Sequence, residues 1–272
     1  MSDPTAIVMI GATGRMGRMI LELAARRPDR YAIAGAVEAP GHPALGQPLS
    51  QLVPGGPSTV SVADQPPAQA PPRTVAIHFS LPGGSMQHLG WSRDHGGPVL
   101  IGTTGFSDAQ STEIRAASEH APILLTPNTS RGVNVLFWLA RQATRLLGPD
   151  YDIEIVEMHH HHKEDAPSGT ARRLTEVVLA ERQGNYDRDA RHGRQGQTGR
   201  RPAGEVGVHA LRGGDVVGDH TVVLAGPNER VELTHRAHSR ELFAAGALQA
   251  ADWLREQAPG FYTMDDLLGL KG

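Results

Sequence analysis

Four consecutive histidines, His159 to His162, and Lys163 stand mid-chain, where a predicted strand leads toward a predicted helix. Imidazoles exchange protons near neutral pH, and a lysine ammonium can donate one. His159 and His161 could share one face of an extended segment, but a zinc site would also need a carboxylate or thiolate ligand at suitable spacing. Proton transfer is therefore the favoured chemistry, with metal binding as the weaker alternative.

The residues that follow predict an anion-binding site. Ser168 is of a type favoured at a helix N-cap, and Gly169 and Thr170 begin a helix expected over residues 170–182. The first N–H groups of a helix carry partial positive charge, and Lys163 adds a full one. We therefore expect a carboxylate-bearing substrate that is protonated during the reaction.

A second candidate site follows the first predicted strand, residues 6–10. Gly11, Gly14 and Gly17 come directly before a predicted helix, where the absence of side chains lets a pyrophosphate approach the helix start. Glu38 ends the next predicted strand, where a carboxylate can accept hydrogen bonds from an adenosine ribose. These features predict a bound dinucleotide.

Further strand exits should line the same crevice, because ligands of a doubly wound sheet bind at the carboxyl ends of its strands. Their small and hydroxyl-bearing residues suit a nicotinamide and its ribose: Phe79 to Pro82, then Gly102, Thr103 and Thr104, then Thr126, Pro127, Asn128 and Thr129. Residue 39 is Ala, which offers no cation to a 2'-phosphate, although Arg15 and Arg18 lie close in sequence. We expect NADH to serve at least as well as NADPH.

The elements that position these residues fall into two patterns. Strands and helices alternate through the first 130 residues, which predicts an α/β, Rossmann-like, doubly wound parallel sheet. Beyond them, an apolar helix (133–147), an alternating strand (151–158) and strands over 206–211, 215–225 and 230–237 predict an α+β domain with a mixed, mostly antiparallel sheet. The basic segment 185–204 is interpreted as a mobile loop.

Composition excludes several classes of function. The 272-residue chain has no Cys, so disulfide frameworks, thiolate zinc sites and the thioester chemistry of semialdehyde dehydrogenases are ruled out. Its formal charge of −3 offers no basic excess for nucleic acid or anionic membranes. The sequence has neither a signal-peptide pattern nor a membrane-length apolar run, so we expect a soluble, cytoplasmic protein.

The segment Glu157 to Thr170 closely resembles the signature of dihydrodipicolinate reductases, also called 4-hydroxy-tetrahydrodipicolinate reductases. Other stretches resemble this family's motifs in the same order: Gly11 to Gly17, Gly102 to Phe106, Asn128 with Gly132-Val133-Asn134, and Thr234-His235 through Ser239-Arg240 to Gly246-Ala247. The resemblance spans essentially the whole chain.

The resemblance implies NAD(P)H-dependent reduction of 4-hydroxy-tetrahydrodipicolinate, a small cyclic dicarboxylate, to tetrahydrodipicolinate in lysine and diaminopimelate biosynthesis, without a metal. In this family hydride adds to the conjugated ring and the resulting enamine-like anion takes up a proton. The resemblance implies His159 as the acid/base residue and Lys163 as the proton donor. The residues alone leave open which of the two delivers the proton.

The resemblance also implies the remaining contacts. Substrate carboxylate would be bound by His160, Gly169 and Thr170, with Ser168 and Thr104 assisting. Cofactor contacts would come from Gly11, Ala12, Thr13, Gly14, Arg15, Met16, Glu38, Gly102, Thr103, Thr104, Thr126, Pro127, Asn128 and Thr129. Many members carry a basic residue where this chain has Ala39, which again argues against strong use of NADPH.

The family further implies a division of labour along the chain. Residues 1–130 would bind the dinucleotide, with 240–272 packing back onto them, and residues 131–239 would bind substrate and build a homotetramer. Hinge closure is then expected to bring the two sites together. The sequence is also compatible with two other functions: a non-catalytic dinucleotide sensor, and a zinc hydrolase that uses the four histidines.

Overall fold

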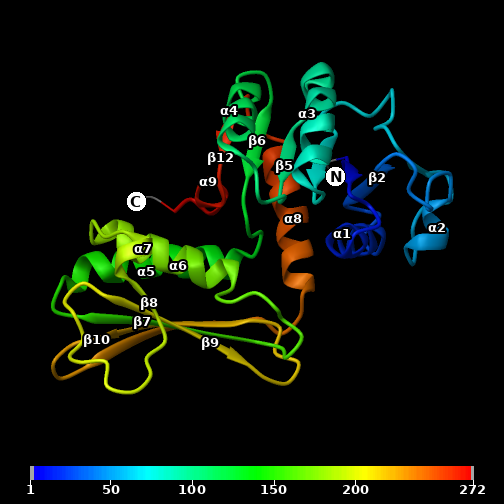
Figure 1. Ribbon diagram of the computed structural model, residues 1–272. Helices are drawn as coiled ribbons and strands as arrows, with labels where there is room; N and C mark the ends of the chain where they lie inside the picture. Colours follow the sequence, from blue (N-terminus) through cyan, green and yellow to red (C-terminus); the bar gives the residue numbers. More distant parts are fainter. Residues whose placement is uncertain (1–2, 271–272) are drawn as a thin grey trace. The chain divides into compact units, whose positions relative to one another are not determined.

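The structure is a computed structural model that describes residues 3–270 (Figure 1). The chain forms two compact units. One contains the described residues up to Ser130 together with those from Glu241 onward, and the other is Arg131–Arg240.

The first unit is built on a sheet of seven strands among the described residues, and all of its pairings are parallel. In spatial order these are β12 (Gly260–Tyr262), β6 (Pro122–Leu125), β5 (Val99–Ile101), β4 (Val75–His78), β1 (Thr5–Ile10), β2 (Tyr31–Val37) and β3 (Val62–Ala63). The central strands β1, β4 and β5 are buried throughout, as expected of a parallel sheet covered on both faces. The predicted doubly wound parallel sheet is confirmed.

Helices cover both faces of this sheet. On one face α1 (Arg15–Ala25) and α8 (Glu241–Leu254) pack on each other and on alternate residues of β1, with Leu21, Leu248 and Met9 in one buried cluster. On the other face α3 (Pro82–His95) and α4 (Asp108–Ala117) bury Leu89 and Ile114 against β5 and β6. The short helices α2 (Leu49–Leu52) and α9 (Met264–Leu268) complete the unit.

The second unit contains a mixed sheet, as predicted. Its order is β11 (Arg230–Arg236), β10 (Asp219–Ala225), β7 (Asp152–His159), β9 (Val206–Arg212) and β8 (Ala190–His192). Strand β10 is antiparallel to both of its neighbours, whereas β9 is parallel to both of its own.

One face of this second sheet carries the helices α5 (Arg131–Leu147) and α6 (Gly169–Glu181), which pack on each other, and the short α7 (Tyr186–Asp189) packs on α6 (Figure 1). Alternation along β7 places Ile153 and Ile155 under these helices, while Asp152 and Glu154 lie on the opposite face, as predicted. By the same alternation Glu157 lies on the helix-covered face.

The basic segment 185–204 is more ordered than predicted. It contains α7 and β8, and two of its arginines fold back onto β7. Arg194 binds both carboxylate oxygens of Glu154 at 3.1 and 2.8 Å, and Arg201 binds one of them at 3.2 Å. The prediction of a loop was therefore wrong for residues 186–192, which form α7 and β8, whereas residues 193–204 contain no helix or strand. The ion pairs to Glu154 were not predictable because this acid lies far away in sequence.

None of the helices in the described part of the chain has the length and apolar character that a membrane span requires.

Candidate active site

The glycine turn after β1 forms a tight cradle at the start of α1. Gly11 has φ +85°, and a Cβ there would lie 2.4 Å from the carbonyl oxygen of Phe79. A Cβ on Gly17 would lie 2.1 Å from the carbonyl oxygen of Gly11, so the first turn of α1 can approach β1 only without a side chain. Gly14 is the N-cap of α1. The helix start is thus presented to a ligand by backbone alone, which suits a pyrophosphate.

A pocket of about 550 Å³ opens at this turn. Its lining joins the turn to the exits of β2 and β4, and contains the predicted cofactor residues Gly11, Thr13, Gly14 and Glu38 together with Ala39. One carboxylate oxygen of Glu38 accepts hydrogen bonds from both the N–H and the hydroxyl of Thr13, each at 2.7 Å. The acid is therefore held at the pocket wall, and the residues present fit the adenosine half of a dinucleotide.

Several other predicted cofactor residues use their side chains internally. The buried hydroxyl of Thr103 lies 2.8 Å from that of Ser85, Thr126 donates to the carbonyl of Asn128, and Thr129 donates to the carbonyl of Phe243. These hydrogen bonds tie the strand exits to neighbouring segments of the first unit. The remaining predicted residues lie at the same edge of the first unit: Ala12, Arg15, Met16, Gly102, Thr104 and Pro127.

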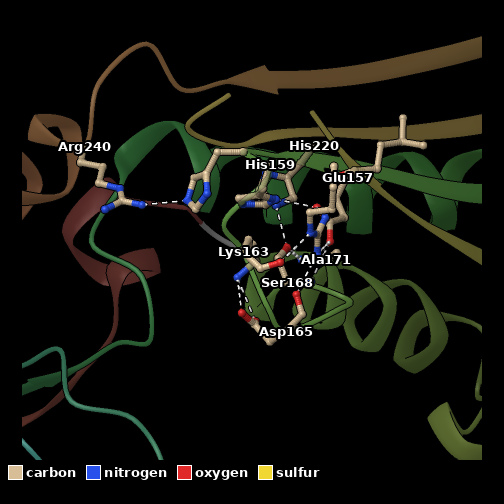
Figure 2. Close-up of polar contacts among 11 residues, drawn as sticks. Glu157, His159, Lys163, Asp165, Ser168, Ala171, His220 and Arg240 are labelled. Atoms are coloured by element: carbon tan, nitrogen blue, oxygen red, sulfur yellow. Dashed lines mark hydrogen bonds and ion pairs between the residues drawn. The ribbon is translucent and has the colours of Figure 1, made fainter. Parts of the chain in front are cut away.

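The second unit gathers the residues predicted to transfer protons where β7 ends and α6 begins (Figure 2). His159 is the last residue of β7, and its Nδ1 lies 2.5 Å from a carboxylate oxygen of Glu157. Lys163 follows in the connecting loop and donates to both oxygens of Asp165, at 2.7 and 2.9 Å. The hydrogen bond from Lys163 lowers the pKa of Asp165.

Glu157 is the buried centre of this site, with none of its side chain exposed. Besides His159, it accepts hydrogen bonds from the N–H of Ser168 at 3.0 Å and from two guanidinium nitrogens of Arg212 at 2.9 and 3.1 Å. Burial alone raises the pKa of a carboxyl group, but the hydrogen bonds from His159, Arg212 and Ser168 lower the pKa of Glu157 to about 2. Glu157 is therefore ionised at neutral pH.

Ser168 is the N-cap of α6, as predicted, and its Oγ accepts from the N–H of Ala171 at 3.2 Å. The same Oγ lies 3.0 Å from Nε2 of His220. Burial, followed by the nearby His159, lowers the pKa of His220 to about 3, so this imidazole is neutral. An added Cβ on Gly169 would meet no atom within 4 Å, which leaves open space at the helix start.

His160 has a separate partner. Its Nε2 accepts a hydrogen bond from Arg240 at 2.9 Å, which Figure 2 shows at the edge of the group. Desolvation and then the Arg240 cation lower the pKa of His160. His161 instead contacts the carbonyl of Gly214 at 2.8 Å and the ring of His162 at 3.9 Å between centroids. In the described part of the chain, no three histidine or acidic side chains are arranged to hold a metal ion.

The structure thus brings together most of the predicted substrate-site residues on one connection of the second unit: His159, His160, Lys163, Ser168, Gly169 and Thr170. Thr104, predicted to assist them, belongs to the first unit.

Four residues of this site were not predicted from the sequence to have a role: Glu157, Arg212, His220 and Arg240. One signal was available for Glu157, because the alternation Ile153, Ile155, Glu157 places a carboxylate on a buried face, where it needs partners. Arg212 gave no comparable signal. It lies beside His159 only because β9 pairs in parallel with β7, about 50 residues away in sequence.

A doubly wound unit with a glycine-turn pocket, joined to a unit that holds acid–base residues at a helix start, defines a two-domain pyridine-nucleotide-dependent oxidoreductase. Two family models match the chain, "Dihydrodipicolinate reductase, N-terminus" over residues 5–129 and "Dihydrodipicolinate reductase, C-terminus" over residues 132–268. The chain belongs to the dihydrodipicolinate reductase family.

Relatives with the name 4-hydroxy-tetrahydrodipicolinate reductase match the chain end to end. The one from Anaeromyxobacter dehalogenans is 47% identical over 98% of this chain and 99% of its own length. The one from Nitrosomonas europaea is 43% identical over 98% of this chain and 99% of its own. These matches agree with the family resemblance found in the sequence.

Solved structures agree on the fold. Dihydrodipicolinate reductase from Paenisporosarcina sp. TG-14, solved with dipicolinate bound, superposes with a TM-score of 0.74 at 20% identity, over 96% of this chain and 97% of that one. An amine dehydrogenase from Mycobacterium smegmatis gives a TM-score of 0.55 at 13% identity, over 97% of this chain and 96% of that one. The two-unit plan is thus shared with oxidoreductases of other substrates.

Proposed function

We propose that this chain reduces 4-hydroxy-tetrahydrodipicolinate to tetrahydrodipicolinate with a pyridine nucleotide, as a step of lysine and diaminopimelate biosynthesis. The observation that carries this proposal is the grouping of His159, Lys163 and the start of α6 on a single connection. A cyclic dicarboxylate needs cationic and N–H groups for its charges and an acid for the carbon that becomes an anion. The name shared by the full-length relatives supports this substrate.

In this mechanism the substrate loses water, gains hydride at the ring and gains a proton. A bound nicotinamide supplies the hydride from its C4 position. His159 offers Nε2 for proton exchange, because its Nδ1 is engaged by Glu157. Lys163 exchanges its contact with Asp165 for a substrate carboxylate or donates the proton. His160, Ser168, Gly169 and Thr170 bind carboxylate, and Thr104 assists.

Cofactor binding is proposed for the first unit, with the pyrophosphate at residues 11–16 and the adenosine ribose on Glu38. Gly102 to Thr104 and Thr126 to Thr129 would contact the nicotinamide half. NADH is proposed to serve at least as well as NADPH, because Ala39 at the pocket wall carries no charge. No metal takes part in the proposed reaction.

The remaining proposals concern the whole protein. The second unit binds substrate and forms a homotetramer through its sheet, and the protein acts in the cytoplasm. These proposals rest on the family resemblance.

A coupled assay tests the proposed function. Pyruvate, aspartate semialdehyde and dihydrodipicolinate synthase generate the substrate, and the loss of NADH absorbance is followed after this protein is added. We expect absorbance to fall in proportion to the protein concentration, and only when the synthase is present. NADH binding without oxidation would instead favour a dinucleotide sensor.

A further inference from the structure

We infer that the buried ion pair of Glu157 and Arg212 is the positioning device of the proton-transfer site. It fixes the tautomer of His159 and ties together the Lys163 loop and the start of α6. This inference rests on the acid–base roles proposed for His159 and Lys163. Neither Glu157 nor Arg212 is assigned to the reaction itself.

Glu157 and Arg212 meet on neighbouring strands in a bidentate geometry. Glu157 is fully buried on the helix-covered face of β7, and Arg212 occupies the paired position beside His159 on β9. Two separate guanidinium nitrogens reach the two carboxylate oxygens, at 2.9 and 3.1 Å. This bidentate geometry holds the carboxylate plane as well as its charge.

The ionised Glu157 determines which ring nitrogen of His159 carries the hydrogen. An ionised carboxylate has no proton to donate, so the 2.5 Å contact requires that Nδ1 of His159 carries the hydrogen and donates it to Glu157. Nε2 is then the nitrogen that can accept or release a proton toward a ligand. A buried carboxylate on the far ring nitrogen also stabilises the imidazolium that forms when Nε2 is protonated.

Glu157 and Arg212 also make hydrogen bonds to the start of α6 and to the loop that carries Lys163. Glu157 accepts the N–H of Ser168, which is the N-cap of α6. Arg212 also donates to the carbonyls of Lys163 at 3.3 Å and Asp165 at 2.7 Å. One ion pair therefore contacts the residue that would exchange the proton, the loop that carries the lysine and the helix start that would bind carboxylate.

The stability of the fold does not by itself require the charges of Glu157 and Arg212, since a buried ion pair can often be replaced by apolar residues without loss of stability. A positioning role and a structural role thus predict different results when both charges are removed together. A positioning role predicts that stability recovers while turnover does not.

The matched control is Glu154, which lies on the same strand but on its opposite face. It is likewise ionised and held by Arg194, Arg201 and His209, and these hydrogen bonds keep its pKa at about 2 despite burial. It has no contact with His159 or Lys163 among the interactions of the described residues. Glu154→Gln therefore breaks a similar network outside the site.

The experiment compares Glu157→Gln, Glu154→Gln and the double variant Glu157→Gln with Arg212→Met. For each protein the thermal midpoint, kcat, KM for both substrates and the ¹⁵N spectrum of the histidine rings are measured. A glutamine at 157 that keeps its oxygen toward the N–H of Ser168 and one guanidinium nitrogen of Arg212 turns its amide NH₂ toward Nδ1 of His159. We therefore expect the His159 hydrogen to move from Nδ1 to Nε2.

We expect Glu157→Gln to lower kcat by roughly 100-fold, the lower end of the effect of losing a positioned acid or base, because the ring then holds its hydrogen on the wrong nitrogen. In Glu157→Gln, KM for the nucleotide should change by less than about twofold, since the first unit is not altered. In Glu154→Gln, kcat should also change by less than about twofold. The double variant should regain thermal stability but stay slow.

An unchanged His159 tautomer in Glu157→Gln would overturn the inference, whatever the kcat of that variant. So would recovery of both stability and kcat in the double variant. A tautomer change without any loss of kcat would support the positioning of the ring by Glu157 while refuting the proposed role of His159. Because the NMR result needs no turnover, it decides the inference even for a protein that fails the coupled assay.

Discussion

At the scale of single residues, each of the two proposed proton donors is held by its own carboxylate. His159 contacts Glu157, whose carboxylate is buried away from water, whereas Lys163 contacts Asp165, whose side chain is exposed. A contact with an exposed partner is easily exchanged for a ligand, because water already competes for it. The geometry therefore favours a fixed His159 and a Lys163 that can turn toward substrate.

Removal of either donor should slow the reaction without affecting the nucleotide site. We expect His159→Ala and Lys163→Ala each to lower kcat by roughly 100-fold or more, the usual effect of losing a positioned acid. NADH affinity, measured by fluorescence titration, should stay the same. Asp165→Asn is the control, since it removes the negative charge beside Lys163 but keeps the ammonium. Near-wild-type turnover of both alanine variants would refute the assignment.

Nucleotide preference should depend on residue 39. Glu38 is already held by Thr13, and Ala39 beside it carries no charge. Ala39→Arg would place a cation at the pocket wall, so we expect the ratio of kcat/KM for NADPH to that for NADH to rise about tenfold, corresponding to about 1.4 kcal/mol. Steady-state kinetics with both nucleotides measures this, with Ala39→Gln as an uncharged control. A wild-type protein that strongly prefers NADPH would contradict the expectation.

Among the helices, strands and turns, the sequence predicted those whose formation depends on residues close together in the chain. The apolar run of β1, the glycine turn and the N-cap Ser168 all depend on neighbouring residues, and the structure contains each of them. The short β12 and the helix α9 were missed, because β12 becomes a strand only by pairing with β6, far away in sequence. For the same reason the Glu157–Arg212 pair was not predictable.

The strand–turn–helix element gives its own prediction. Gly17→Ala places a methyl group where the carbonyl of Gly11 now lies, so the turn and the start of α1 must move apart. We expect the Kd for NADH to rise at least about tenfold, because the backbone cradle loses its geometry. Isothermal titration with NADH measures this, and the thermal midpoint serves as the control for folding. An unchanged NADH affinity would show that the turn does not bind the pyrophosphate.

At the scale of the whole molecule, buried titratable groups make stability depend on pH. Burial lowers the pKa of His78 to about 3, and among the described residues neither of its ring nitrogens has a hydrogen-bond partner. In the unfolded chain the imidazole of His78 takes up a proton below about pH 6.5, whereas in the folded protein it stays neutral. The stability linked to His78 is therefore complete above pH 6.5 and decreases as the pH falls toward 3. His220 acts in the same direction.

The carboxylates extend this loss to lower pH. Glu154 and Glu157 have folded pKa values of about 2, below their ordinary values, so their contributions hold above about pH 4.5 and are lost as the pH falls toward 2. We expect the thermal midpoint to begin falling below pH 6.5 and to fall more steeply below pH 4.5. His78→Leu should reduce the first part of the decrease, whereas the exposed His120→Gln should not. A flat midpoint between pH 7 and pH 5 would contradict this.

The central claim is that the chain transfers hydride from a pyridine nucleotide to a cyclic dicarboxylate. The most direct measurement follows that hydride, using NADH deuterated on the transferred face of C4, the synthase-generated substrate and mass spectrometry of the product. We expect tetrahydrodipicolinate that carries one deuterium, formed in step with NADH oxidation. Product without deuterium, or NADH that stays reduced in the presence of substrate, would contradict it.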